Sequence, residues 1–212
     1  MVIFMKECAI FTGGEMNSYT SLDVSHLKNT TIISADAGYI HATNLGLKTN
    51  ILIGDFDSLN EIPKDVDEVI KFPKEKDDTD TMLAIKLALE RGFNSIEIYG
   101  ALGKRLDHTF ANIQSLAFIE EHNADGAIIS DTELVYFINS ETIKIFKKVG
   151  FSLSVFSFSE VCEGVTLKGV RYPLVNATVS QNFPIGVCNE IVEDFAEISV
   201  KCGKILIIIS KK

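Results

Sequence analysis

Up to residue 131, short continuous apolar runs alternate with longer segments that have the spacing of an amphipathic helix. The runs predict buried strands at residues 8–12, 31–36, 51–55, 69–72, 95–101 and 127–130. The longer segments predict helices at residues 39–45, 79–91 and 106–122. Strands that alternate with helices pair in parallel, because each crossover helix returns the chain to the same edge of the sheet. We therefore predict an α/β domain with a parallel sheet over residues 1–131.

After residue 131 the pattern changes to closely spaced β-type runs with no useful helical period. These runs are rich in β-branched and aromatic residues, are separated by turn residues, and lie at residues 134–139, 142–146, 151–158, 165–172, 197–201 and 205–210. Closely spaced strands without intervening helices favour an antiparallel sandwich. We therefore predict an all-β domain, a β-sandwich, over residues 132–212.

The composition is that of an ordinary globular protein and excludes several classes. Of 212 residues, 46% are hydrophobic and 23% are charged, which excludes disordered, collagen-like and long coiled-coil chains. The chain has 20 basic and 29 acidic residues and a net charge of −9, which disfavours binding to nucleic acid or to an anionic membrane. A phosphate ligand would require local cations or a metal ion. We expect neither nucleic acid nor membrane as a partner.

The four cysteines indicate a reducing compartment. Cys8, Cys162, Cys188 and Cys202 are far apart and form no C-x-x-C pair, so neither a zinc site nor a redox motif is indicated. We expect reduced thiols, most of them in the core. The chain starts without a signal-peptide pattern, and its most apolar stretch, residues 205–209, is too short to cross a bilayer. We expect a cytoplasmic protein.

Acidic residues stand where predicted strands end. Asp36 closes the second apolar run, and Asp55 and Asp57 close the third within GDFDS at residues 54–58. Residues i and i+2 of an extended chain point the same way, so Asp55 and Asp57 could present paired carboxylates to a hard cation such as Mg²⁺. The alternative is a turn in which Asp and Ser bond the local backbone. These residues alone favour neither interpretation.

A second acidic cluster, KDDTD at residues 76–80, directly precedes an apolar helix. Asp77 or Asp78 could be the N-cap, with Asp80 in the first turn complementing the helix dipole. Capping explains one or two acids, but it explains less well three acids and a lysine in five residues. The crowding of like charges favours a metal-binding role.

A third cluster, GALGKRLDH at residues 100–108, joins a predicted strand to a predicted helix. Two glycines with Lys104 and Arg105 could cradle a phosphate, although Asp107 could equally be an ordinary N-cap. The motifs G-x-x-x-x-G-K-[ST], G-x-G-x-x-G and G-x-S-x-G are absent. We expect His26, His41 and His122 to be surface or hydrogen-bonded residues.

Taken in order, these motifs resemble those of thiamin pyrophosphokinases. The resemblance rests on ADAG at 35–38, GDFDS at 54–58, KDDTD at 76–80 and GALGKRLDH at 100–108. GVRYPL at 169–174 and GVCNE at 186–190 look like the thiamin-binding half of that family. The resemblance covers nearly the whole chain.

The resemblance implies a Rossmann-like α/β catalytic domain, a β-sandwich that binds thiamin, and a homodimer with active sites between subunits. It implies transfer of a pyrophosphoryl group from ATP to the hydroxyl of thiamin, giving thiamin diphosphate and AMP with Mg²⁺ as cofactor. Phosphoryl-type transfer depends on positioning and charge neutralisation, for which carboxylates and cations are the suitable groups.

The resemblance also assigns roles to individual residues. Mg²⁺ would be held by Asp55, Asp57 and Asp80. The catalytic carboxylates would be Asp77, Asp80 and Asp107, with Asp77 supporting the metal and Asp80 or Asp107 accepting the proton of the thiamin hydroxyl. The nucleotide would be bound by Asp36, Lys104, Arg105, Asp107 and His108. Thiamin would lie near Tyr172, Cys188 and Asn189.

The chain departs from the family pattern at three places. Ala37 and Lys104 each replace a usual glycine, and Cys188 replaces a usual serine. A thiol is a weaker hydrogen-bond partner than a hydroxyl, so this last change concerns thiamin recognition. Two other functions use similar residues: a different Mg²⁺-dependent phosphohydrolase or nucleotidyltransferase, and a non-catalytic nucleotide or thiamin sensor. Retention of the acidic clusters argues against the sensor.

Overall fold

The computed structural model describes residues 5–56, 61–73 and 77–212. The chain divides into two compact units, Met1–Asp131 and Thr132–Lys212. Within the described ranges, no helix is both long enough and apolar enough to cross a membrane.

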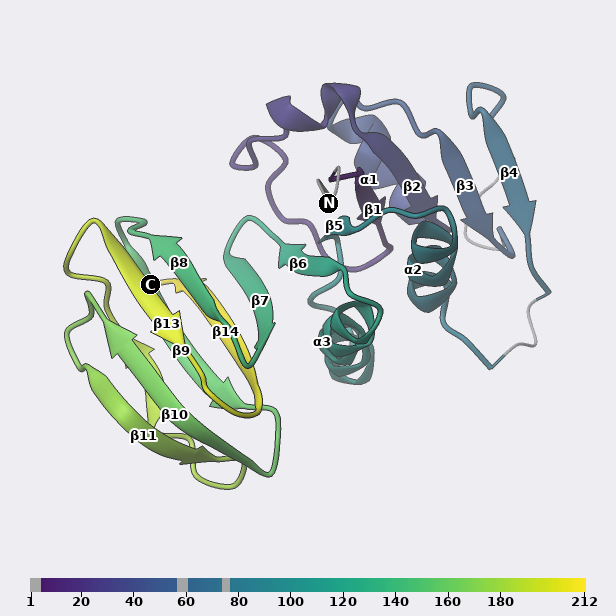
Figure 1. Cartoon of the computed structure of the whole chain (residues 1–212). Helices are drawn as coiled ribbons and strands as arrows, with labels where there is room; N and C mark the ends of the chain where they lie inside the picture. The colour runs from purple at the N-terminus through teal and green to yellow at the C-terminus, as the bar shows by residue number, and fades with distance from the viewer. Residues whose placement is uncertain (1–4, 57–60, 74–76) are drawn as a thin grey trace. The chain divides into compact units, whose positions relative to one another are not determined.

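The first unit contains the strands and helices that the apolar pattern predicts. The strands are β1 (Glu7–Phe11), β2 (Thr31–Ala35), β3 (Ile51–Gly54), β4 (Glu68–Lys71), β5 (Ser95–Tyr99) and β6 (Asp125–Ile129). The helices are α1 (Gly38–Asn44), α2 (Asp80–Glu90) and α3 (Leu106–Glu121), with α1 behind the sheet and α2 and α3 in front of it in Figure 1. A short 3-10 helix, η1 (Ser25–Asn29), is the element that the pattern did not predict.

All strand pairs in this unit are parallel, as predicted, and their order is β6-β5-β1-β2-β3-β4. Along the chain, β2, β3 and β4 are added in turn on one side of β1, and β5 and β6 are then added on its other side. The strand order therefore reverses at β1. In open α/β sheets, ligands bind beyond the carboxyl ends of the strands at such a reversal.

The central strands are buried along almost their whole length, as expected for a sheet covered on both faces. Ile10, Ile33, Leu52 and Ile98 are completely inaccessible to solvent. On the face covered by η1 and α1, the ring of Phe11 stacks on that of Tyr99, with 4.9 Å between ring centroids. Phe11 and Tyr99 are the last residues of β1 and β5, so this packed layer ends where the loops after both strands begin.

The second unit is a β-sandwich of two antiparallel sheets, which confirms the predicted fold class. One sheet has the order β12-β9-β14-β7 and the other β11-β10-β13-β8. The strands are β7 (Glu133–Asn139), β8 (Thr142–Phe146), β9 (Phe151–Ser157), β10 (Val161–Lys168), β11 (Leu174–Ser180), β12 (Gly186–Asn189), β13 (Phe195–Ser199) and β14 (Lys204–Lys211). Ile145, Leu153, Leu167 and Ile207 belong to one shared core between the sheets.

Two details of the predicted sandwich are wrong. The strand expected at residues 165–172 begins and ends four residues earlier, at Val161 and Lys168. It ends there because Gly169 has a positive φ of 72° and lies so close to the next strand that a Cβ would meet Phe195 O at 2.3 Å. The strands β11 and β12 were not predicted, because only three of their eleven positions are buried and the apolar pattern is weak.

Gly38 provides a test of how closely α1 approaches the sheet. An added Cβ at this position would lie 2.0 Å from the carbonyl oxygen of Phe11. We predict that Gly38→Ala lowers the free energy of unfolding by about 1–3 kcal/mol or more, because backbone on both sides must move. Urea denaturation measures the change.

Asn44→Ala is the matched control, since Asn44 is exposed on the same helix. It should change the free energy of unfolding by no more than about 0.5 kcal/mol. Equal stabilities for Gly38→Ala and the wild type would contradict the close approach.

Candidate functional site

A cavity of about 320 Å³ lies at the carboxyl ends of β1, β2 and β5, where the strand order reverses. Three loops and the first turns of α2 and α3 line it. Five of the residues singled out from the sequence meet there: Asp36, Asp80, Lys104, Arg105 and His108. The cavity therefore combines carboxylates with cations, the pairing needed to hold a polyphosphate and a metal ion together.

Asp36 reaches the cavity because the chain turns sharply after β2. Its backbone has a left-handed φ of 48°, and its N–H donates to Ile53 O at 2.8 Å, while its carbonyl accepts from Tyr39 N at 3.2 Å. The neighbouring strand leaves room for this turn because it ends in Gly54, whose added Cβ would lie 3.3 Å from the Cβ of Asp36. Asp36 is thus fixed at the edge of the sheet by its backbone.

The start of α2 brings Asp80 to the cavity and corrects the predicted cap. Thr79 is the N-cap, and its Oγ1 accepts from Met82 N at 3.1 Å. The expectation that Asp77 or Asp78 caps the helix is wrong, because Asp78 instead accepts from Lys86 Nζ at 2.6 Å. Asp80 is in the first turn, as expected. Asp77 is exposed and borders a neighbouring cavity with Met82 and Ser115.

Of the two carboxylates predicted to follow β3, the structure describes Asp55 alone. Asp55 directly follows β3, is half-buried, and is not among the residues that line the cavity. Asp57 lies outside the residues that the structure describes. Within the described residues, no three His, Cys, Asp or Glu side chains form a ready group that could hold a metal ion.

The chemistry of the cavity nevertheless suits Mg²⁺. Asp36 and Asp80 supply hard carboxylate oxygens to the cavity lining, and Asp55 follows the adjacent strand. Mg²⁺ is commonly held by one or two carboxylates, with waters and substrate phosphates completing its coordination. A pair of carboxylates beside two cations fits that mode of binding.

The loop before α3 carries the cationic groups. Lys104 has a left-handed φ of 55°, and its Nζ donates to Gly13 O at 2.9 Å. Arg105 occupies the N-cap position, so the alternative in which Asp107 caps the helix is wrong. Arg105 Nε instead donates to Asp107 Oδ1 at 3.1 Å, and this contact lowers the pKa of the Asp107 carboxyl. Asp107 does not line the cavity.

Sequence reasoning missed several groups at this site. Thr12, Gly13 and Gly14 line the cavity, and so does the buried Asn112, whose Nδ2 donates to Ala101 O at 2.8 Å. Two consecutive glycines directly after a strand were the available signal for Gly13 and Gly14. Asn112 had none, because it stands within a helix.

In the second unit, Tyr172, Cys188 and Asn189 lie at one end of the β12 strand. The Asn189 side chain, only 3% exposed, accepts from Tyr172 N at 3.0 Å and donates to Tyr172 O at 2.7 Å. Its oxygen also accepts from Glu190 N at 2.9 Å. Tyr172 itself is 64% exposed, and the exposed Cys188 has a left-handed φ of 58°. Asn189 therefore holds the backbone of Tyr172, whereas Cys188 N donates to Ser154 Oγ at 3.1 Å.

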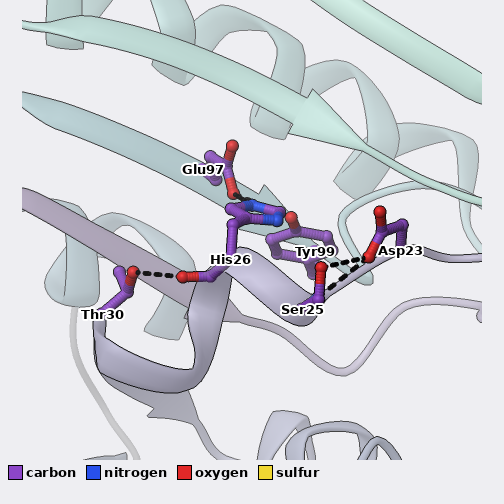
Figure 2. Close-up of polar contacts among 6 residues, drawn as sticks. All are labelled: Asp23, Ser25, His26, Thr30, Glu97 and Tyr99. Carbon is purple, nitrogen blue, oxygen red and sulfur yellow. Dashed lines mark hydrogen bonds and ion pairs between the residues drawn. The ribbon is translucent and has the colours of Figure 1, made fainter.

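A separate polar cluster lies on the face of the first sheet. Figure 2 shows His26 beside Glu97, whose Oε2 lies 3.0 Å from His26 Nε2 and accepts from the Tyr99 hydroxyl at 2.8 Å. This cluster attaches η1 to β5. His122 Nδ1 also has a partner, Phe118 O at 2.7 Å, so the expectation that these histidines are surface or hydrogen-bonded residues is confirmed.

Comparison with known proteins agrees with this geometry. Residues 24–127 match the family model of the thiamin pyrophosphokinase catalytic domain. Residues 140–205 match the model of the thiamin pyrophosphokinase vitamin B1 binding domain.

Individual relatives span the whole chain. Thiamine pyrophosphokinase from Bacillus subtilis (strain 168) is 29% identical over 210 residues, which cover 96% of this chain and 98% of the relative. A crystal structure of thiamine pyrophosphokinase from Bacillus subtilis has a TM-score of 0.86 at 27% identity, covering 98% of this chain and 100% of the other.

A crystal structure of a thiamin pyrophosphokinase family protein from Enterococcus faecalis has a TM-score of 0.78 at 26% identity, covering 98% of this chain and 99% of the other. The two family models together span both units, and the relatives match from one end of the chain to the other. This chain belongs to the thiamin pyrophosphokinase family.

Proposed function

We propose that this protein transfers the pyrophosphoryl group of ATP to the hydroxyl of thiamin, giving thiamin diphosphate and AMP. The observation that carries the proposal is the cavity at the reversal of strand order, which Asp36 and Asp80 line together with Lys104 and Arg105. An anionic triphosphate requires cations, and its metal ion requires carboxylates. Both kinds of group are present within one enclosure, although the protein as a whole is acidic.

The nucleotide is held by the loops after β1 and β5. Lys104 and Arg105 bind phosphate oxygens, the Arg guanidinium by its two-pronged donor geometry, and His108 adds a further donor at the rim. Asp36 orients the nucleotide from the opposite side. Because reaction geometry contributes most of the rate in such transfers, fixed loops matter more than covalent help from a side chain.

Asp55, Asp57 and Asp80 would hold Mg²⁺, with Asp77 supporting them. When bound, Mg²⁺ neutralises phosphate charge and aligns the polyphosphate for displacement. Asp55 follows β3, and Asp80 stands in the first turn of α2 and lines the cavity together with Lys104. Carboxylate oxygens are the ligand type this ion prefers.

The thiamin oxygen attacks the β-phosphorus, and the bond from that phosphorus to the oxygen bridging to the α-phosphate breaks, which releases AMP. The hydroxyl proton passes to Asp80 rather than Asp107. The geometry supports this choice: Asp80 lines the cavity, whereas Asp107 is held by Arg105 and does not line it.

Thiamin is bound by Tyr172 and Cys188 of a second copy of the chain, while Asn189 fixes the backbone of Tyr172. Exposed apolar side chains on the same unit support a homodimer, namely Val175, Phe183, Ile185, Val187 and Val192. We place the protein in the cytoplasm, in keeping with four free cysteines, two of them exposed.

The first test is product analysis. The purified protein, mixed with thiamin, ATP and Mg²⁺, should form thiamin diphosphate and AMP in equal amounts. A chelator should abolish both products. Release of phosphate or pyrophosphate without a diphosphorylated acceptor would instead indicate a phosphohydrolase or nucleotidyltransferase. Binding of ATP and thiamin without turnover would indicate a sensor.

The second test concerns Asp80. Asp80→Asn should lower kcat by about a hundredfold or more, because charge stabilisation in the transition state is lost. Asp78→Asn is the matched control, since Asp78 stands two residues away and pairs with Lys86. That half-exposed pair contributes about 0–1 kcal/mol to stability, so the variant should stay folded. Because Asp78 does not line the cavity, its turnover should stay within about twofold of the wild type. Turnover of Asp80→Asn within about twofold of the wild type would remove Asp80 from the mechanism.

The third test concerns Cys188. Cys188→Ser should lower the KM for thiamin by up to about tenfold, since a hydroxyl forms the stronger hydrogen bond and such a bond contributes about 1 kcal/mol. The KM for ATP should not change. Cys202→Ser, at the other exposed cysteine, should leave both constants unchanged. A higher KM for thiamin in Cys188→Ser would show that this site prefers the thiol.

A further inference from the structure

His41 stands behind the cavity, on α1, and both of its ring nitrogens are engaged. Nε2 lies 3.0 Å from Gly14 O, and Nδ1 lies 2.8 Å from the hydroxyl of Tyr19. A carbonyl oxygen only accepts hydrogen bonds, so Nε2 must carry a hydrogen. In the neutral ring Nδ1 is then the acceptor, and the Tyr19 hydroxyl donates to it. The two partners together select one tautomer.

The surroundings keep this ring neutral. Burial lowers the pKa of His41, the bond to Gly14 O raises it, and the charge on Lys104 lowers it again. The neutral ring adds no further positive charge beside Lys104. It acts as a hydrogen-bond donor of fixed direction, aimed at one backbone carbonyl.

The Gly14 carbonyl belongs to a loop whose backbone packs closely against the loop after β5. Gly14 N donates to Gly100 O at 2.6 Å, and a Cβ on Gly14 would lie only 2.2 Å from the same oxygen. Thr12 Oγ1 donates to Gly100 O as well, so the loops after β1 and β5 are joined at this point. The two loops are those that carry the glycines and cations of the cavity.

The His41 ring touches both loops. It donates to Gly14 in the first, and a Cβ on Gly100 in the second would lie 3.1 Å from its Cδ2. The preceding carbonyl, Gly13 O, accepts from Lys104. Each of the two glycine carbonyls therefore has a side-chain donor, Gly13 O from a cavity cation and Gly14 O from the histidine.

We propose that His41 is a positioning residue that fixes the Gly13–Gly14 turn and so shapes the nucleotide half of the cavity. It acts through Gly14 and does not line the cavity. The inference rests on the proposed function, because it requires the cavity to bind ATP. Without the imidazole donor, the Gly14 carbonyl loses its partner, and the peptide is free to rotate toward another one. Such rotation displaces Gly13 and, with it, the anchor of Lys104.

A pair of amide variants separates hydrogen bonding from packing. The amide nitrogen of Gln reaches about as far as Nε2 of His, whereas that of Asn is one carbon shorter. We expect His41→Asn to weaken binding of a non-hydrolysable ATP analogue with Mg²⁺ by about tenfold or more, measured by calorimetry. His41→Gln should bind the analogue within about threefold of the wild type. Binding of thiamin should be unchanged in both.

A control and a second readout complete the experiment. His122→Asn removes another histidine that contacts a backbone carbonyl, outside the cavity lining, and should not alter analogue binding. Nitrogen NMR of ring-labelled histidine in the wild-type protein at neutral pH should show His41 as a neutral ring with hydrogen on Nε2. This readout does not require any variant to fold.

The outcomes separate the two proposals. If the wild type binds the analogue and His41→Asn binds it equally tightly, the positioning role is wrong. If His41→Gln and His41→Asn weaken binding equally, the ring acts by packing alone, and the positioning role is wrong. A His41 ring with its hydrogen on Nδ1 would also contradict that role. If the folded wild type does not bind the analogue at all, the proposed function itself fails.

Discussion

The parallel pairing of β1 with β2 on one side and β5 on the other determines where the chemistry of this protein can take place. Phe11 is in register with Ser34 and with Tyr99, so the three strands end nearly level. The loops that follow them leave the sheet at one edge and are forced together there. Asp36 and Lys104, distant in the chain, face the same cavity for this reason. The backbone ladder brings the loops to that edge, and side chains such as Thr12 and His41 then hold their backbone in place.

Close backbone contact is the second consequence of that pairing. Gly14 and Gly38 lie so near to neighbouring carbonyls that any side chain would clash, and Asp36 and Lys104 adopt left-handed conformations that cost energy outside glycine. A cavity wall built this way presents backbone atoms and leaves room for a bulky ligand. The same loops place Lys104 and Arg105 together at the cavity, where they can attract phosphate although the protein carries a net negative charge.

The sequence was most informative where hydrophobic burial is continuous. The central strands of the first sheet could be predicted because strands such as β3 are buried throughout. It was least informative where exposed residues form regular structure, as in β11, or where backbone crowding ends a strand, as at Gly169. The carboxylates and cations of the cavity could be found from their positions after strands. The role inferred for His41 could not, because its partners, a carbonyl and a tyrosine, become neighbours only after folding.

The position of β14 in the sandwich has a consequence for biosynthesis. This strand lies between β7 and β9 and pairs with both along most of its length, yet it follows every other strand of its unit in the chain. Until the ribosome has delivered it, β7 and β9 each expose an unsatisfied edge, and the strands of the sandwich cannot close over their core. A translation product that stops short of residue 204 is therefore a substrate for chaperones and proteases, whereas the α/β unit is by then fully synthesised.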